Sequence, residues 1–148
     1  QVPPSGGGGG IMARILSIDY GGKRTGLAVT DPLQIIATGL TTIDSKELIP
    51  FLKKYFSTEQ VELIIIGMPL NWDETDTHGT PLVKAAIKKL QKEFPGMPLK
   101  TVDERYTSKM AKDAMLEMGM KKKDRRVKSN VDLIAATIIL QEYLQSVQ

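Results

Sequence analysis

Four carboxylates stand at places in the sequence where functional sites often form. Asp19 ends a short apolar run near the N-terminus, and Asp103 and Glu104 end another run in the second half of the chain. Asp132 opens a helical pattern near the C-terminus. Carboxylates gathered at one site repel one another, and a divalent cation relieves that repulsion. Two such cations can activate a water molecule and stabilise the leaving oxygen during phosphodiester cleavage.

Each acid taken alone also has a purely structural explanation. Asp132 would favour the positive end of a helix, Asp103 would form a turn, and Asp19 would cap the bend at Gly21 and Gly22. The set is more specific than its members, because the ends of strands and the starts of helices are where sites form.

Composition limits the other chemistry that the chain can perform. Its 148 residues include no cysteine and one histidine, His78. Disulfides, thiolate nucleophiles, iron–sulfur clusters and zinc sites with cysteine or several histidines are therefore excluded. Carboxylates with a hard cation such as Mg²⁺ or Mn²⁺ remain as the main chemical agents.

The positive charge is concentrated in one segment. The formal net charge is only +3, yet residues 100–130 contain ten Lys or Arg against five Asp or Glu. This excess favours a polyanionic partner, although a solvated helix face and loop would have the same composition. No apolar run approaches the ~20 residues of a membrane span, so no membrane partner is expected.

The first eleven residues, QVPPSGGGGGI, are typical of a flexible leader or tag. Residues 12–148 are expected to form a single domain, since their number suffices for one core and not for two.

Hydrophobic patterning predicts an α/β domain with the order β-β-β-α-β-α-β-α-α. The expected strands are 15–19, 25–30, 35–43, 61–67 and 99–103, and the expected helices are about 45–56, 80–94, 108–118 and 131–144. Three strands joined by short turns predict an antiparallel meander, and the later strands predict parallel pairing. The result is a five-stranded mixed sheet with helices on both faces, the first and fourth strands being central parallel neighbours and the fifth lying beside the fourth.

Helix boundaries are predicted from capping residues. Asp44 or Ser45 is expected to cap the first helix, where Pro50 implies a later start or a distorted first turn. Thr80 is expected to cap the second helix, with Pro81 in its first turn.

Four motifs in fixed order resemble the YqgF family. They are IDYGGKRTGLAVTD at 18–31, GMPLNWD at 67–73, TVDERYTS at 101–108 and VDLIAATIILQEYL at 131–144, and the match covers about residues 12–144. Members of that family are described as Holliday junction resolvases acting in DNA recombination, and as nucleases that process the 5′ end of pre-16S rRNA in ribosome biogenesis. The resemblance implies a ribonuclease H-like fold and a hydrolase acting on phosphodiester bonds.

The resemblance also implies roles for individual residues. Asp19, Glu104 and Asp132 would be the catalytic acids that bind Mg²⁺ or Mn²⁺, with Asp103 adjacent to them without contacting the metal. Arg24 and Arg105 would lie near a phosphate, although each arginine could instead offset the neighbouring acids. The cations expected to bind nucleic acid are Lys23, Arg24, Arg105, Lys121, Lys122, Lys123, Arg125, Arg126 and Lys128.

One loop departs from the family pattern. The family usually has Asn-Met-Asp-Gly where this chain has Asn71-Trp72-Asp73-Glu74, and the glycine is delayed to Gly79. Trp72 could stack on an unpaired base, but a lone tryptophan beside a loop is more often a packing anchor. His78 is interpreted as an ordinary loop residue. The departure affects the expected substrate role of this loop and leaves the three acids untouched.

The function that these observations favour is a metal-dependent endonuclease acting on structured nucleic acid, either branched DNA or pre-16S rRNA, as a cytoplasmic monomer or homodimer. A non-catalytic nucleic-acid-binding factor for ribosome assembly is the alternative on the same fold. An ATP-binding domain of the actin and sugar-kinase type also begins with an Asp-x-Gly turn like Asp19-Tyr20-Gly21. Those enzymes close two domains around the nucleotide, whereas this chain supplies one.

Overall fold

The computed structural model describes residues 13–69, 79–103 and 128–147. Five strands form one sheet in the order β3-β2-β1-β4-β5. The strands are β1 (Arg14–Tyr20), β2 (Arg24–Thr30), β3 (Ala37–Asp44), β4 (Val61–Met68) and β5 (Leu99–Asp103). The helices are the short 3₁₀ helix η2 (Ser45–Glu47), α1 (Leu48–Thr58), α2 (Thr80–Glu93) and α5 (Lys128–Ser146). The expected helix at 108–118 and the leader lie outside the described residues.

Strand pairing follows the predicted topology. β1 pairs antiparallel with β2, and β2 pairs antiparallel with β3, so the first three strands form a meander. β1 pairs parallel with β4, and β4 pairs parallel with β5. The predicted mixed sheet is confirmed, with β1 and β4 adjacent at its centre. The carboxyl ends of β1, β4 and β5 therefore meet at one edge, where ligands of such sheets commonly bind.

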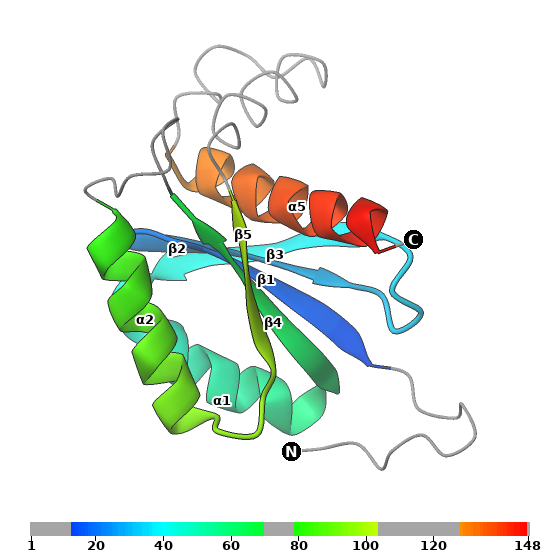
Figure 1. Ribbon diagram of the computed structural model, residues 1–148, viewed down its shortest axis with the longest axis horizontal. Helices are drawn as coiled ribbons and strands as arrows, with labels where there is room; N and C mark the ends of the chain where they lie inside the picture. The colour runs from blue at the N-terminus through cyan, green and yellow to red at the C-terminus, as the bar shows by residue number, and fades with distance from the viewer. Residues whose placement is uncertain (1–12, 70–78, 104–127, 148) are drawn as a thin grey trace.

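Helices cover both faces of the sheet (Figure 1). α5 lies on one face, where Ile139 and Leu140 pack against Ile15 and Ile65. α1 and α2 lie on the other face, where a larger cluster includes Leu16, Ile18, Leu27, Leu52, Ile66 and Leu90. Because side chains alternate along a strand, odd-numbered residues of β1 point toward α5 and even-numbered ones point away from it.

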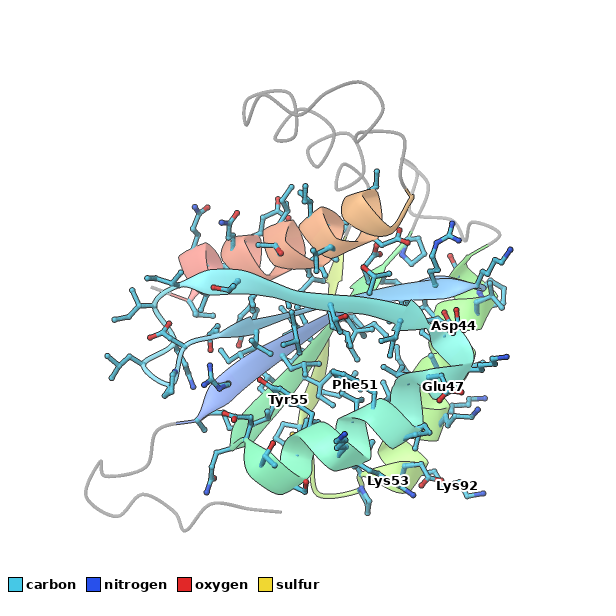
Figure 2. The ribbon with its side chains drawn as sticks, turned by 180° about the vertical axis from the view of Figure 1, so that it is seen from behind. Asp44, Glu47, Phe51, Lys53, Tyr55 and Lys92 are labelled. Carbon is cyan, nitrogen blue, oxygen red and sulfur yellow. The ribbon has the colours of Figure 1, made fainter. Side chains whose placement is uncertain are left out.

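The first helix begins later than its capping residues suggest, as Pro50 predicts. η2 is a tight 3₁₀ turn, and α1 starts only at Leu48, so Pro50 falls in the first turn, where a missing N–H costs little. Figure 2 shows α1 with Phe51 and Tyr55 on one side of it, and their rings stack at a centroid distance of 6.1 Å.

The capping predictions were only partly right. Asp44 is the N-cap residue of η2 but its side chain makes no cap hydrogen bond, and the Ser45 hydroxyl bonds to the Gly21 carbonyl instead. Thr80 is already helical, with Gly79 as the N-cap residue. The Thr80 hydroxyl donates to the carbonyl of Pro69 at 2.5 Å, which ties the start of α2 to the end of β4.

β3 begins at Ala37, two residues later than expected. The Asp31 carboxylate accepts the backbone N–H groups of Leu33, Ile35 and Ile36, at 3.1, 2.8 and 2.7 Å. These N–H groups are therefore engaged in the loop and not in the sheet. The same bonds lower the pKa of Asp31, because they stabilise its ionised form.

In the part of the chain that the structure describes, no helix is long and apolar enough to cross a membrane.

Candidate active site

The sheet brings two of the predicted acidic positions to one edge. Ile18 of β1 pairs with Ile66 of β4, and two residues farther along β4, Met68 pairs with Asp103 of β5. Asp19 and Asp103 therefore lie at the carboxyl ends of β1 and β5, on the same edge of the sheet, as the sequence predicts. Glu104 follows Asp103 directly and lies outside the described residues.

Asp19 belongs to the face of the sheet that α5 covers. Two residues before it, the Ser17 hydroxyl donates to the carbonyl of Ala136 in α5 at 2.8 Å. Alternation places Asp19 on the same face as Ser17, and its side chain is half-buried. The carboxylate of β1 is thus directed to the helix that carries Asp132.

Gly26 lets α5 approach this part of the sheet closely. It pairs with Asp19 across the β1–β2 ladder. A Cβ atom at Gly26 would lie 2.5 Å from the carbonyl carbon of Asp132, closer still to its oxygen, and 3.1 Å from the nitrogen of Leu133. The backbone at Asp132 therefore rests directly on β2, one strand away from Asp19. This contact brings together two acids that are more than a hundred residues apart in the sequence.

Asp132 lies deeper in its helix than predicted. The expected helix began at about residue 131, but α5 begins at Lys128, so Asp132 is the fifth residue and no acid lies in the first turn. The helix dipole acts mainly within the first turn and therefore explains little of this position. The residue is buried, with 7% of its surface exposed.

Arg24 forms an ion pair with this acid. Its Nε lies 3.7 Å from Oδ2 of Asp132. On β2, Arg24 is two residues from Gly26 and shares its face, so it is a diagonal neighbour of Asp19. Asp19, Arg24 and Asp132 therefore all lie next to Gly26 in the sheet or on the helix that covers it.

A network of hydroxyl groups holds the β1–β2 turn in place. The N–H of Gly21 donates to the carbonyl of Arg24 at 3.0 Å, and the N–H of Ser45 donates to the carbonyl of Lys23 at 3.0 Å. The Ser45 hydroxyl bonds to the Gly21 carbonyl at 2.5 Å and to the Thr25 hydroxyl at 2.7 Å. The turn that follows Asp19 and precedes Arg24 is therefore fixed to the end of β3.

Sequence reasoning missed Gly26, Thr25 and Ser45 as parts of this site. A signal for Gly26 existed, because an isolated glycine inside a strand pattern often marks a close approach of another backbone. No comparable signal distinguishes Ser45, since a serine before a helix is ordinarily interpreted as a cap.

Asp103 has a different setting from Asp19. Val102 packs with the α5 cluster, so alternation directs Asp103 to the opposite face, and its side chain is exposed. Its charge nevertheless reaches α5. Burial raises the pKa of Glu142, and repulsion by Asp103 raises it further.

Few of the predicted nucleic-acid-binding cations can be placed. Lys23 is exposed at the tip of the β1–β2 turn, and Arg24 is half-buried beside Asp132. Lys128 begins α5, but its side chain is not described. The predictions that lie outside the described residues are Arg105, Lys121, Lys122, Lys123, Arg125, Arg126, Trp72, His78 and the loop sequence at 71–74.

The described part of the site fits a hard divalent cation in its donor chemistry. Asp19 and Asp132 offer carboxylate oxygens, the ligand type that Mg²⁺ and Mn²⁺ prefer. No group of three or more metal-ligating side chains occurs among residues 13–69, 79–103 and 128–147. The expected third acid, Glu104, falls in a gap between these ranges.

Comparisons with known proteins agree with the motif resemblance. The model of the family described as "RuvX: Holliday junction resolvase" matches residues 13–146. A protein of Christiangramia forsetii is 53% identical over 133 residues, covering 90% of this chain and 98% of its own. A protein of Bacteroides thetaiotaomicron is 50% identical over 135 residues, covering 91% and 98%. Both carry the name "Putative pre-16S rRNA nuclease".

Solved structures show the fold. RuvC of Thermus thermophilus in complex with a Holliday junction substrate superposes with a TM-score of 0.52 at 14% identity, covering 90% of this chain and 96% of that one. A second structure of Thermus thermophilus RuvC superposes with a TM-score of 0.50 at 12% identity and has the same coverage. The predicted ribonuclease H-like fold is confirmed by this similarity.

Proposed function

The chain belongs to the RuvX family of Holliday junction resolvases, and from this membership we propose that it is a metal-dependent endonuclease that hydrolyses phosphodiester bonds of structured nucleic acid. The observation that supports the proposal is that Gly26 pairs with Asp19 in the sheet and lies directly under the backbone of Asp132. The names of the relatives extend it to pre-16S rRNA, whose 5′ end is the expected substrate, and the family description extends it to branched DNA. Neither a non-catalytic assembly factor nor an ATP-binding domain is favoured by these names.

Asp19, Glu104 and Asp132 are proposed as the catalytic acids that hold Mg²⁺ or Mn²⁺. A divalent cation at this place supplies an activated water and stabilises the leaving oxygen. The two described acids come from different elements, a strand and a helix, whose backbones are fixed by Gly26 and by the bond from Ser17 to Ala136. Such fixed positions favour catalysis, because little reorganisation is needed during the reaction.

The surrounding residues are proposed to bind the substrate backbone. Lys23 stands exposed at the turn tip, and Arg24 lies beside Asp132. Arg105 and the basic residues between 121 and 128 add charge that matches phosphate and carries no base specificity. Asp103 is proposed to act on its neighbours through its charge.

The catalytic unit is proposed to be one domain, residues 12–148, working in the cytoplasm, where bacterial rRNA precursors and chromosomal DNA are found. A monomer suffices for cleavage of an RNA end. A four-way junction presents paired strands, so its symmetric cleavage would require a homodimer.

Cleavage assays test the proposal. Pre-16S rRNA and a four-way DNA junction are incubated with the protein and Mg²⁺ or Mn²⁺. Asp19→Asn, Glu104→Gln and Asp132→Asn should each reduce the rate by about 10²-fold or more. Glu62→Gln is the matched control, because Glu62 is exposed on β4 and distant in sequence from the site. Full activity of all three acid variants would reject the proposed site, and inactivity of the unaltered protein on both substrates would reject the proposed function.

A further inference from the structure

Arg24 and Asp132 form an ion pair that is longer than a hydrogen bond. Nε and Oδ2 are 3.7 Å apart, beyond the range of an N–H···O hydrogen bond. The Arg24 Nε is buried and makes no hydrogen bond within the described residues. Nε therefore acts on Asp132 through charge and not through a hydrogen bond.

Asp132 needs a positive charge close to it. Its side chain is only 9% exposed, and removing the counter-charge of a buried carboxylate is strongly unfavourable. Arg24 supplies that charge while 36% of its own side chain remains exposed. One end of the pair is thus enclosed, whereas the other has access to solvent.

The backbone of Arg24 is fixed, whereas part of its side chain is open to solvent. Its carbonyl accepts from the N–H of Gly21, and the residue pairs with Asp44 of β3. A movement of the guanidinium therefore needs only side-chain rotation. Arginine is also suited to a phosphate, which it can bind with two parallel hydrogen bonds.

We propose that Arg24 is a removable counter-ion: it neutralises Asp132 in the metal-free protein and moves to a substrate phosphate when a divalent cation occupies that carboxylate. This inference rests on the proposed function, because it requires the carboxylate to bind a metal. Arg24 then couples metal binding to substrate binding.

A removable counter-ion affects metal binding in a way that a purely structural ion pair does not. Arg24 and a divalent cation compete for the same carboxylate and repel each other, so removing the arginine should tighten metal binding. By linkage, metal and nucleic acid should strengthen each other's binding in the unaltered protein. That mutual effect should disappear without the guanidinium.

Titration with Mn²⁺, followed by calorimetry in the absence of nucleic acid, tests the competition. Arg24→Gln should bind Mn²⁺ about tenfold more tightly than the unaltered protein, within the range usual for coupled sites. Arg24→Lys, which keeps the charge, should bind it with nearly unchanged affinity. Arg14→Gln is the matched control, since Arg14 pairs with Glu59 at 3.0 Å from the opposite end of β1. Equal or weaker Mn²⁺ binding by Arg24→Gln would overturn the proposal.

The coupling between metal binding and nucleic-acid binding is tested by measuring nucleic-acid binding in the presence of Ca²⁺. Ca²⁺ is larger than Mg²⁺, and it permits binding to be measured apart from Mg²⁺-dependent cleavage. Ca²⁺ should strengthen binding of a phosphorylated RNA strand to the unaltered protein, and this gain should be lost in Arg24→Gln. Retention of the full gain in Arg24→Gln would reject the transfer of the guanidinium to phosphate.

Two further results keep the inference separate from the proposed function. If no variant binds any divalent cation and none cleaves, the metal-dependent function fails together with the inference. If Mn²⁺ binds and cleavage occurs but Arg24→Gln shows no gain in affinity, only the inference fails. Should Arg24→Gln not fold, the ¹⁵Nε resonance of Arg24 in the unaltered protein serves instead. It should shift on addition of Mg²⁺, and an unchanged resonance at saturation would overturn the proposal.

Discussion

A single methyl group at Gly26 should separate α5 from the sheet. The Cβ atom of Gly26→Ala would lie 2.5 Å from the carbonyl carbon of Asp132, whereas real Cβ contacts essentially never fall below 3.0 Å. The neighbouring atoms belong to the backbone of Asp132 and Leu133, which has no flexible end that can swing aside. Either α5 moves outward or β2 moves inward, by about 1 Å, before ordinary contact distance is restored.

The cost can be stated for both stability and activity. Overpacking of a well-packed interior typically lowers the free energy of unfolding by about 1–3 kcal/mol. Displacing a catalytic group by about 1 Å can reduce the rate by about 10²-fold. Because Gly26 pairs with Asp19 and touches Asp132, the same shift would change the separation of the two acids.

Urea unfolding and nucleic-acid cleavage measure the two effects. Gly96→Ala is the matched control, since a Cβ atom at Gly96 meets no atom within 4 Å, and its change should stay within about 0.5 kcal/mol. If Gly26→Ala had the stability and the cleavage rate of the unaltered protein, the close approach of α5 to β2 would not position the site.

Two further predictions concern the surroundings of the site. Ser45→Ala removes the hydroxyl that bonds to the Gly21 carbonyl at 2.5 Å, so urea unfolding should show a free energy of unfolding lower by about 1–2 kcal/mol. Ser57→Ala, on the exposed side of α1, is the control and should change this free energy little. Equal effects of the two substitutions would contradict the turn's dependence on the Ser45 bond. Glu142→Gln should stabilise the protein at pH 7. Burial and Asp103 raise the pKa of Glu142, so the folded state favours the protonated carboxyl. The ionised form therefore costs stability above the raised pKa, and the advantage of Gln should vanish below the ordinary value of 4.5. Urea unfolding at pH 7 and pH 4 checks this, and a gain of equal size at both pH values would refute it.

The order and pairing of the strands could be predicted because local patterns determine them. The run at 61–67 is apolar throughout, which indicates a strand covered on both faces, and short turns between the first three strands leave only antiparallel pairing. Asp19 could be placed at the edge of the sheet for the same reason, because it lies near the end of a strand whose neighbouring strands could also be predicted.

Contacts between distant segments could not be predicted in the same way. The approach of Asp132 to Gly26 depends on the crossing of α5 over β2, which no local pattern encodes. Ser45 was assigned to the wrong partner, because its hydroxyl has a local choice as a cap and a tertiary choice at Gly21. The late start of β3 has a similar origin in the side-chain bonds of Asp31.

The most direct test of the proposed active site is a crystal structure with Mn²⁺, in which anomalous scattering locates the ion independently of activity. The ion should be bonded to carboxylate oxygens of both Asp19 and Asp132, at about 2.0–2.2 Å, beside Gly26. Mn²⁺ bound elsewhere in a protein that cleaves nucleic acid, with Asp19 and Asp132 left uncoordinated, would contradict it.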